Sequence, residues 1–404
     1  MKILQINTTV NSGSTGRIAE EIGKVLIANG HESYIAYGRC NQESKSIKIK
    51  IGSSKDINIH GLITLLTDRH GFGSKTATQK LIKEIDIINP DVIGLHNIHG
   101  YYINIEVLFK YIAEKNIPVI WTLHDCWSFT GHCTYFDSVG CEKWKIQCEK
   151  CPKTKMYPAS FGYDNSFKNY RDKKYIFNQI ENLQIITPSN WLKDLVTQSF
   201  LKHPATCIHN GTDINLFKPI LDTESVIKKW SIKNKKIVLG VASIWDERKG
   251  LSDFIEMSKM LSIDYKIILI GLSKKQIAEL PQNVIGIQRT ESVEELALYY
   301  SLASVFVNPT YQDNFPTTNI EALACGTPVI TYNTGGSPEA IDQETGEVVP
   351  KGDKKALQEA IIKWCTTKNE DEVQKKCRER ALQFFNKDDR YLEYLHLYEK
   401  ISKK

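Results

Sequence analysis

The residues best suited to chemistry lie between Asn308 and Glu339, in the stretch NPTYQDNFPTTNIEALACGTPVITYNTGGSPE. Two acids, Asp313 and Glu321, flank a proline at position 316. Proline is favoured at a first helical position because its missing N–H is not needed there, so a helix should begin near Pro316. The free amides of that first turn would attract a diphosphate. A carboxylate one turn inside the helix could accept hydrogen bonds from a ribose diol.

A basic turn, WDERKG at residues 245–250, follows the expected strand KKIVLGVAS. Charge on leaving phosphates rises as a sugar–phosphate bond breaks, and a fixed cation would stabilise it. Lys249 is the candidate for that cation, and Arg248 or Arg289 for a second one. An isolated Arg-Lys pair is more often a solvated basic turn, so this interpretation depends on the neighbouring motifs.

Asp313, seven intervening residues and Glu321, followed by ALACGTPVI and GGSPE, resemble the paired-acid motif of the retaining glycosyltransferases of family 4. The resemblance extends over most of the chain. It is similar in detail to the branch that builds bacterial capsule, exopolysaccharide and lipopolysaccharide chains. It implies an α/β fold of the GT-B type, with two Rossmann-like domains facing an interdomain cleft. The family usually has Glu where this chain has Asp313, which leaves the donor sugar open.

The resemblance also implies roles for individual residues. Glu321 would hold the ribose, Asp313 the donor hexose and Lys249 the diphosphate, while His124 would contact the hexose near the reacting carbon. The catalytic candidates are therefore His124, Lys249 and Asp313. The donor-binding candidates are Gly13, Gly16, Arg248, Lys249, Asp313, Asn314, Phe315, Pro316, Thr317 and Glu321, with backbone N–H groups from Asn314 to Thr317 serving the hexose and phosphates. His96 is a candidate on the acceptor side only.

The loop SGSTGR, residues 12–17, joins the first expected strand to the first expected helix. Gly13 and Gly16 allow the backbone to approach a ligand closely, and Thr15 is expected to cap the helix. The spacing is not the G-x-G-x-x-G of dinucleotide enzymes, which disfavours a dehydrogenase. An ordinary strand-to-helix turn explains the same glycines about as well.

Five of the ten cysteines fall between Cys126 and Cys151. The spacing of Cys133, Cys141, Cys148 and Cys151 is compatible with four thiolates around one structural zinc ion. Cys126 and His132 are possible substitutes, and an iron–sulfur cluster is a less favoured alternative. The alternative without a metal is a set of unligated cysteines packed among aromatic side chains.

Strands alternating with helices must position these residues, which predicts parallel sheets with helices on both faces. A first series includes residues 2–7, PDVIGLHN, IPVIWTLHD and LQIITPS, and a second includes KKIVLGVAS, YKIILIG, NVIGIQ, SVFVNPT and PVITYN. We expect an acceptor-side domain over 1–206 with a cysteine-rich insertion at 126–158. A nucleotide-sugar domain over 207–386 follows, and a C-terminal helix at 387–404 packs back towards the first domain.

Length and composition fit two globular domains: the chain has 404 residues and a formal net charge of +5. That charge is too small for a nucleic-acid binder but permits weak docking on acidic lipids. The N-terminal apolar stretch is too short for a signal peptide, and no run approaches the roughly 18 residues of a membrane span. We therefore expect a cytoplasmic protein, at the inner face of the membrane.

The resemblance implies transfer with retention from a UDP- or GDP-sugar, without a catalytic metal. The acceptor would be a saccharide or a polyprenyl-diphosphate-linked saccharide. Two other functions stay open at this point. One is a different enzyme on the same architecture, such as a nucleotide-sugar epimerase or a sugar phosphorylase. The other is a non-catalytic partner that binds nucleotide sugar during polysaccharide assembly.

Overall fold

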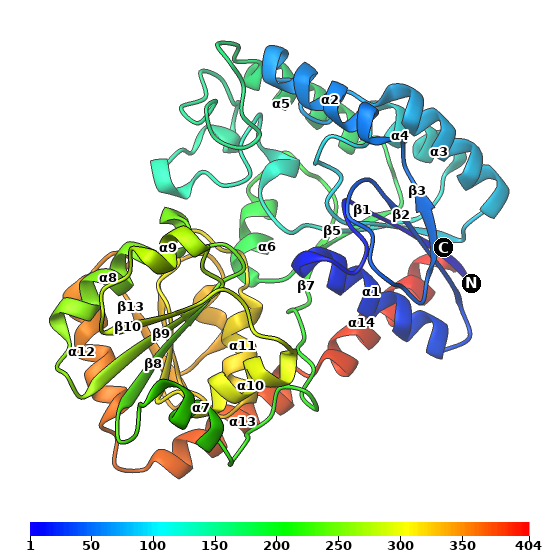
Figure 1. Ribbon diagram of the computed structural model, residues 1–404. Coiled ribbons are helices and arrows are strands. Elements are labelled where there is room, and N and C mark those ends of the chain that lie inside the picture. The colour runs from blue at the N-terminus through cyan, green and yellow to red at the C-terminus, as the bar shows by residue number, and fades with distance from the viewer. Residues whose placement is uncertain (404) are drawn as a thin grey trace. The chain divides into compact units, whose positions relative to one another are not determined.

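The computed structural model describes residues 1–403, so the last residue of the predicted segment 387–404 lies outside the described residues. The chain forms two compact units (Figure 1). Unit 1 contains Met1–His209 and the C-terminal residues from Arg390 on, and unit 2 contains Asn210–Asp389. No helix within the described residues is both long and apolar enough to cross a membrane.

Unit 1 is built on a seven-stranded sheet in the order β3-β2-β1-β4-β5-β6-β7, with every neighbouring pair parallel. Its strands are β1 (Lys2–Asn7), β2 (Glu32–Tyr37), β3 (Ile47–Lys50), β4 (Val92–Leu95), β5 (Val119–Thr122), β6 (Leu183–Thr187) and β7 (Ala205–Cys207). The central strands are buried runs rich in β-branched residues, as strands covered on both faces must be. The predicted parallel sheet is confirmed.

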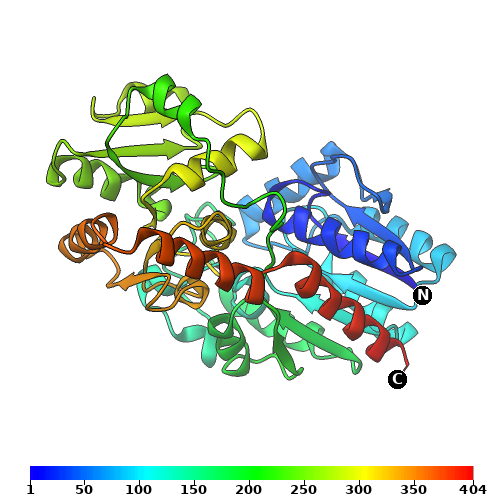
Figure 2. The same cartoon turned by 90° about the horizontal axis from the view of Figure 1, so that it is seen from below.

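Helices cover both faces of this sheet. They are α1 (Gly13–Ala28), α2 (Ser54–Thr67), α3 (Lys75–Ile88), α4 (Ile105–Lys115), α5 (Ser166–Phe177), α6 (Asn190–Thr197) and α14 (Lys387–Ser402). Successive residues of β1 face opposite ways: Leu4 belongs to the larger core and Ile3 to a second core with Tyr394 and Tyr398 of α14. The predicted return of the C-terminal helix is confirmed, and Figure 2 shows α14 on the same side of the sheet as α1.

Unit 2 has a six-stranded parallel sheet in the order β10-β9-β8-β11-β12-β13. Its strands are β8 (Lys236–Val241), β9 (Tyr265–Ile270), β10 (Val284–Ile287), β11 (Val305–Asn308), β12 (Val329–Tyr332) and β13 (Gly346–Val349). Its helices are α7 (Glu224–Trp230), α8 (Leu251–Met260), α9 (Lys274–Ala278), α10 (Val293–Leu302), α11 (Thr317–Ala324), α12 (Lys354–Cys365) and α13 (Glu370–Phe384). All five strands predicted for the second series form.

The strand orders place a topological switch point between β1 and β4 in unit 1 and between β8 and β11 in unit 2. Doubly wound sheets bind ligands at the carboxyl ends of the strands at such a point. The predicted basic turn follows β8, and the predicted loop with the first acid follows β11. In unit 2, the fold therefore brings the two main motifs that are predicted to bind the donor to one edge of one sheet.

Candidate active-site residues

The basic turn after β8 folds as a short 3-10 helix, η4 (Glu247–Lys249). The side chain of Asp246 caps it by accepting a hydrogen bond from the Lys249 N–H at 3.0 Å. Gly250 ends the turn at φ +75°, a left-handed conformation that favours glycine, and a side chain there would meet the carbonyl of Pro309. The local sequence thus fixes the backbone from which Lys249 extends.

Arg248 ties η4 to the loop after β11. Its carbonyl accepts hydrogen bonds from the Tyr311 N–H at 2.7 Å and the Thr310 hydroxyl at 3.3 Å. Its guanidinium donates to the Gln312 carbonyl at 2.9 Å. The loop is therefore held against the basic turn on both sides of Arg248, while the exposed Arg289 takes no part in this arrangement.

Lys249 and Asp313 meet where the loops after β8 and β11 converge. The Nζ of Lys249 lies 2.5 Å from Oδ2 of Asp313, and the two side chains are 19% and 17% exposed. The other oxygen of Asp313 accepts the Asn314 N–H at 2.9 Å. The cation and the first acid, 64 residues apart in the chain, form one ion pair.

Helix α11 begins at Thr317, and Pro316 is its N-cap rather than its first helical residue. No side chain caps this start, and the anion site that the sequence predicts here stays a prediction. The predicted set of backbone donors needs a correction. Pro316 has no N–H, and the Asn314 N–H is already engaged by Asp313. Phe315 is 4% exposed and its ring packs against Phe385 at 5.8 Å, so its side chain belongs to the core.

Glu321 lies one turn inside α11, where a tyrosine holds it. The hydroxyl of Tyr300, from α10, donates to Oε2 of Glu321 at 3.0 Å. Burial and the adjacent carboxylate hold the pKa of Tyr300 well above its usual value, so this phenol stays a donor. Glu321 is half-buried and keeps acceptor capacity for a ligand.

A buried amide fixes α11 against the sheet. Asn319 is fully buried, accepts a hydrogen bond from Asn308 of β11 at 2.7 Å and donates to the Ser337 hydroxyl at 3.1 Å. Ser337 begins the 3-10 helix η5 (Ser337–Ala340), and its hydroxyl also lies 2.6 Å from that of Thr331. This satisfied network gives the helix one position. The sequence analysis did not identify it.

The glycine loop of unit 1 differs from the prediction at its cap. Helix α1 begins at Gly13 with Ser12 at the N-cap, so Thr15 lies inside the first turn and the predicted Thr15 cap is wrong. Gly13 has φ +67° and open space around it. At Gly16 a Cβ atom would stand 2.6 Å from the Thr9 hydroxyl, so this glycine is required by packing against the chain itself.

His124 follows β5 and ends a chain of hydrogen bonds that defines its tautomer. The Gln5 amide donates to the Ala19 carbonyl at 2.8 Å, which orients its oxygen towards His96 Nε2 at 3.0 Å. His96 must donate there, so its Nδ1 accepts from His124 Nε2 at 3.2 Å. Desolvation lowers the pKa of His124 to about 4, which keeps it neutral, and its Nδ1 carries a lone pair. His96 is 2% exposed and orients His124.

A second pair lies beside this relay. His99 Nε2 is 2.9 Å from Asp125 Oδ2, and Asp125 Oδ1 accepts the Trp127 N–H at 2.9 Å. The Tyr157 hydroxyl lies 3.2 Å from His99 Nδ1. Although burial raises the pKa of Asp125, His99 and the hydrogen bonds outweigh it and hold this pKa below its usual value. The sequence analysis missed this pair, although Asp125 directly follows His124.

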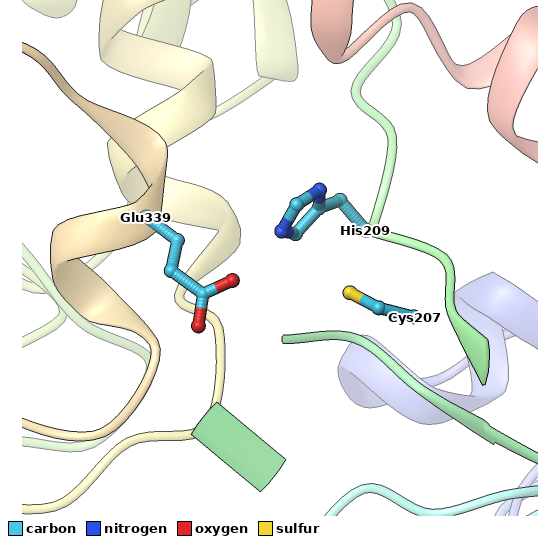
Figure 3. Close-up of side chains that lie close together, drawn as sticks. All are labelled: Cys207, His209 and Glu339. Atoms are coloured by element: carbon cyan, nitrogen blue, oxygen red, sulfur yellow. The ribbon is translucent and has the colours of Figure 1, made fainter. Parts of the chain in front are cut away.

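Cys207 is the last residue of β7, and His209 follows it in the segment that ends the first part of unit 1; Figure 3 draws both side chains. Their spacing of two residues puts both on one side of an extended chain. Glu339, drawn in the same figure, belongs to η5 of unit 2, where its carbonyl and that of Ala340 face the guanidinium of Arg380. None of the three was among the predicted site residues.

Two family models match the chain. The model described as Glycosyltransferase Family 4 matches residues 15–216, and the model described as Glycosyl transferases group 1 matches residues 222–384. The first match covers half of the chain, and together the two matches include every strand of both sheets except β1.

Similar whole chains are also known. The putative colanic acid biosynthesis glycosyl transferase WcaC of Escherichia coli K12 is 25% identical over 86% of this chain and 87% of its own length. The structure of sucrose-phosphate synthase from Thermosynechococcus elongatus has a TM-score of 0.74 at 20% identity, covering 99% of this chain and 98% of that one. HepE of Anabaena, in complex with UDP and glucose, has a TM-score of 0.70 at 15% identity, with 99% of each chain covered. The predicted GT-B class of fold, with two Rossmann-like domains, is confirmed, and the chain belongs to the family 4-like glycosyltransferases.

Proposed function

We propose that this glycosyltransferase transfers a hexose from a UDP- or GDP-sugar, with retention of anomeric configuration, to a saccharide or lipid-linked saccharide in cell-surface polysaccharide biosynthesis. The observation that carries the proposal is the meeting of Lys249 and Asp313 at the switch point of unit 2, on the loop that leads to the uncapped start of α11. Polysaccharide assembly is supported by the similarity to the colanic acid transferase.

The ion pair suggests how the donor is received. Before binding, Lys249 and Asp313 neutralise each other at 2.5 Å. A diphosphate is a stronger partner for the ammonium group, because it carries more charge and more acceptor oxygens. On binding, the phosphates would take Lys249, and the released Asp313 carboxylate could accept hydrogen bonds from hexose hydroxyls. Glu321 would meanwhile hold the ribose. UDP and glucose in the Anabaena neighbour support this donor class.

Transfer would then need positioning and charge stabilisation more than a protein base. The leaving phosphate can take the proton of the acceptor hydroxyl, which attacks from the same face of the sugar, and Lys249 stabilises the charge that develops. His124 would accept a hydrogen bond from a hexose hydroxyl through its unprotonated Nδ1. No step in this scheme requires a catalytic metal ion.

A lipid-linked acceptor would require contact with a membrane surface, and α2 offers one. Its exposed apolar side chains, at positions 59, 62, 63 and 66, have the i, i+3, i+4, i+7 spacing of one helix face. Phe161, 74% exposed, lies beside them because its N–H donates to the carbonyl of Leu65 at 2.7 Å. We propose that this α2 face rests on acidic phospholipid headgroups.

Two experiments test these proposals. Purified protein is mixed with UDP- and GDP-sugars and a panel of saccharide acceptors, and product anomers are assigned by NMR. A retained configuration with stoichiometric nucleotide release supports transfer; an inverted product discards retention, and acceptor-independent sugar isomerisation supports an epimerase instead.

Membrane binding is tested with two variants. Leu62→Glu should weaken sedimentation with acidic vesicles, whereas Ile87→Glu, at an exposed position on α3, should not. Equal sedimentation of both variants would rule out the α2 face.

A further inference from the structure

Four thiols of the insertion gather around one small cavity. Cys133, Cys141, Cys148 and Cys151 all line a cavity of ≈ 20 Å³, and none of them forms a disulfide. The thiols of Cys133 and Cys151 are close enough to interact with each other. A space of this size holds about one water-sized occupant, which suits a single metal ion.

A histidine beside the thiols has an unused nitrogen. His132 also lines the cavity and is 2% exposed. Its Nδ1 lies 2.5 Å from Oδ1 of the fully buried Asp68, whereas its Nε2 is buried without a hydrogen-bond partner. Leaving a buried polar nitrogen unpaired costs about 1–3 kcal/mol. Because Asp68 accepts the Nδ1–H, His132 Nε2 could donate to a metal-bound sulfur only as the N–H of an imidazolium.

Two lysines are buried in or beside the insertion. Lys173 of α5 is 1% exposed and donates to the carbonyls of Trp127 and Thr130 at 2.8 and 3.2 Å. Lys153 is 4% exposed, lines the same cavity and donates to the Tyr135 carbonyl at 3.0 Å. Neither ammonium group has a carboxylate within 4.0 Å in the described part of the chain. A divalent ion with four thiolates carries a net charge of −2, which would complement these two basic side chains.

The insertion has little regular structure that could order it. Between β5 and α5 the described chain forms only 3-10 turns, η1 (Trp127–Phe129), η2 (Asp137–Val139) and η3 (Lys143–Lys145), and Figure 1 draws this part as loops. Its small aromatic core is formed by Phe129, Phe136 and Trp144. A metal supplies order that so few apolar side chains cannot supply.

We propose that Cys133, Cys141, Cys148 and Cys151 bind one structural Zn²⁺ ion as four thiolates. Four thiols release four protons to solvent as the four Zn–S bonds form. No three of the sulfur atoms lie within 4.8 Å of one another here, so the cavity contracts about the ion. Thiolates select zinc over hard cations, and four of them leave no open coordination position.

This zinc would order the loop that contacts the His99–Asp125 pair of unit 1. The insertion follows Asp125 directly, and its two ends contact that pair through the Trp127 N–H and the Tyr157 hydroxyl. The ion is therefore a positioning element for the surroundings of His124 and takes no part in the reaction. Its test does not depend on transfer activity.

The test measures metal in the full-length protein. Protein purified without chelator should contain zinc near one equivalent by mass spectrometry, Cys148→Ser should lose it, and Cys40→Ser, at an exposed cysteine outside the cluster, should keep it. X-ray absorption of the wild-type zinc protein should show four sulfur neighbours, a readout that requires no variant to fold. His132→Gln should keep the zinc. Folded metal-free protein, iron in place of zinc, or a nitrogen neighbour at the ion would overturn the assignment.

Discussion

The Nε2–H of His124 donates a hydrogen bond to Nδ1 of His96, 3.2 Å away. Nδ1 of His96 must be the acceptor, because the Nε2–H of His96 donates to the side-chain oxygen of Gln5. We predict that long-range ¹H–¹⁵N NMR at neutral pH shows His124 as the Nε2–H tautomer. In a His96→Leu variant, both tautomers of His124 should appear, and turnover should fall about fivefold, the value of one neutral hydrogen bond. An Nδ1–H tautomer in the wild-type protein would contradict the relay.

Tyr300 should tune nucleotide affinity through Glu321. Tyr300→Phe removes the hydroxyl that holds the Glu321 carboxylate in place. Without this hydrogen bond Glu321 is less well oriented, and the dissociation constant for the nucleoside diphosphate should rise roughly fivefold. Glu321→Gln should raise it tenfold or more, since hydrogen bonds to charged groups are stronger, about 1.5–3 kcal/mol. Tyr299→Phe is the matched control, because that hydroxyl meets Trp230 Nε1 at 3.0 Å. If calorimetry gives the same dissociation constant for Tyr299→Phe and Tyr300→Phe, Tyr300 has no specific role in nucleotide binding.

Lys249 should act mainly on turnover. Lys249→Met keeps the length of the side chain and removes its charge, so leaving-group stabilisation is lost and kcat should fall about 10²–10³-fold. Lys259→Met changes an exposed lysine of α8 and should leave kcat unaltered. Steady-state kinetics with the best donor measure kcat and KM separately for each variant. A Lys249→Met variant that changes only KM would mean that the cation binds the donor without stabilising the transition state.

Lowering the pH should destabilise unit 1 while its carboxylates are still ionised. Burial lowers the pKa of His60 to about 4, and desolvation lowers that of His124 to about 4, against a usual value of 6.5. Between pH 4 and pH 6.5 the unfolded chain binds more protons than the native unit. The contribution of these histidines to the free energy of unfolding is therefore fully present above about pH 6.5 and is lost as the pH falls toward 4. Each unit of separation is worth roughly 1.4 kcal/mol per group.

Urea denaturation followed by hydrogen exchange in β1 and β5 measures this effect. The midpoint should drop clearly between about pH 7 and about pH 5. A variant at an exposed position, His396→Gln, should show the same drop. A constant midpoint across this range would mean that the buried histidines are already charged in the native state.

The sequence predicted the elements with strong local signals and missed those that depend on distant partners. Buried apolar runs such as KIVLGV and YKIILI gave strands because no other structure suits them. The edge strands β7 and β13 lack a continuous buried apolar run, so they carry too little pattern to identify. Thr15 was taken as a helix cap because the serine at position 12 looked like part of the loop, whereas its extended backbone makes it the N-cap.

Within the candidate site, local motifs indicated Lys249, Asp313 and Glu321, but their partners could not be read from spacing. The bond between Tyr300 and Glu321 joins two helices, and Lys249 reaches Asp313 only because β8 and β11 are neighbours. One signal was available: Gln5 is a polar residue within a strand of apolar ones, and a buried amide needs a partner.

The most direct test of this account is a crystal structure with bound UDP or GDP. We predict that the diphosphate lies at the start of α11, with an oxygen near the Thr317 amide and another on Lys249, and that Glu321 binds the ribose hydroxyls. The Lys249–Asp313 distance should lengthen as the phosphates take the ammonium group. A nucleotide bound elsewhere, or a diphosphate that leaves the Lys249–Asp313 pair intact, would contradict it.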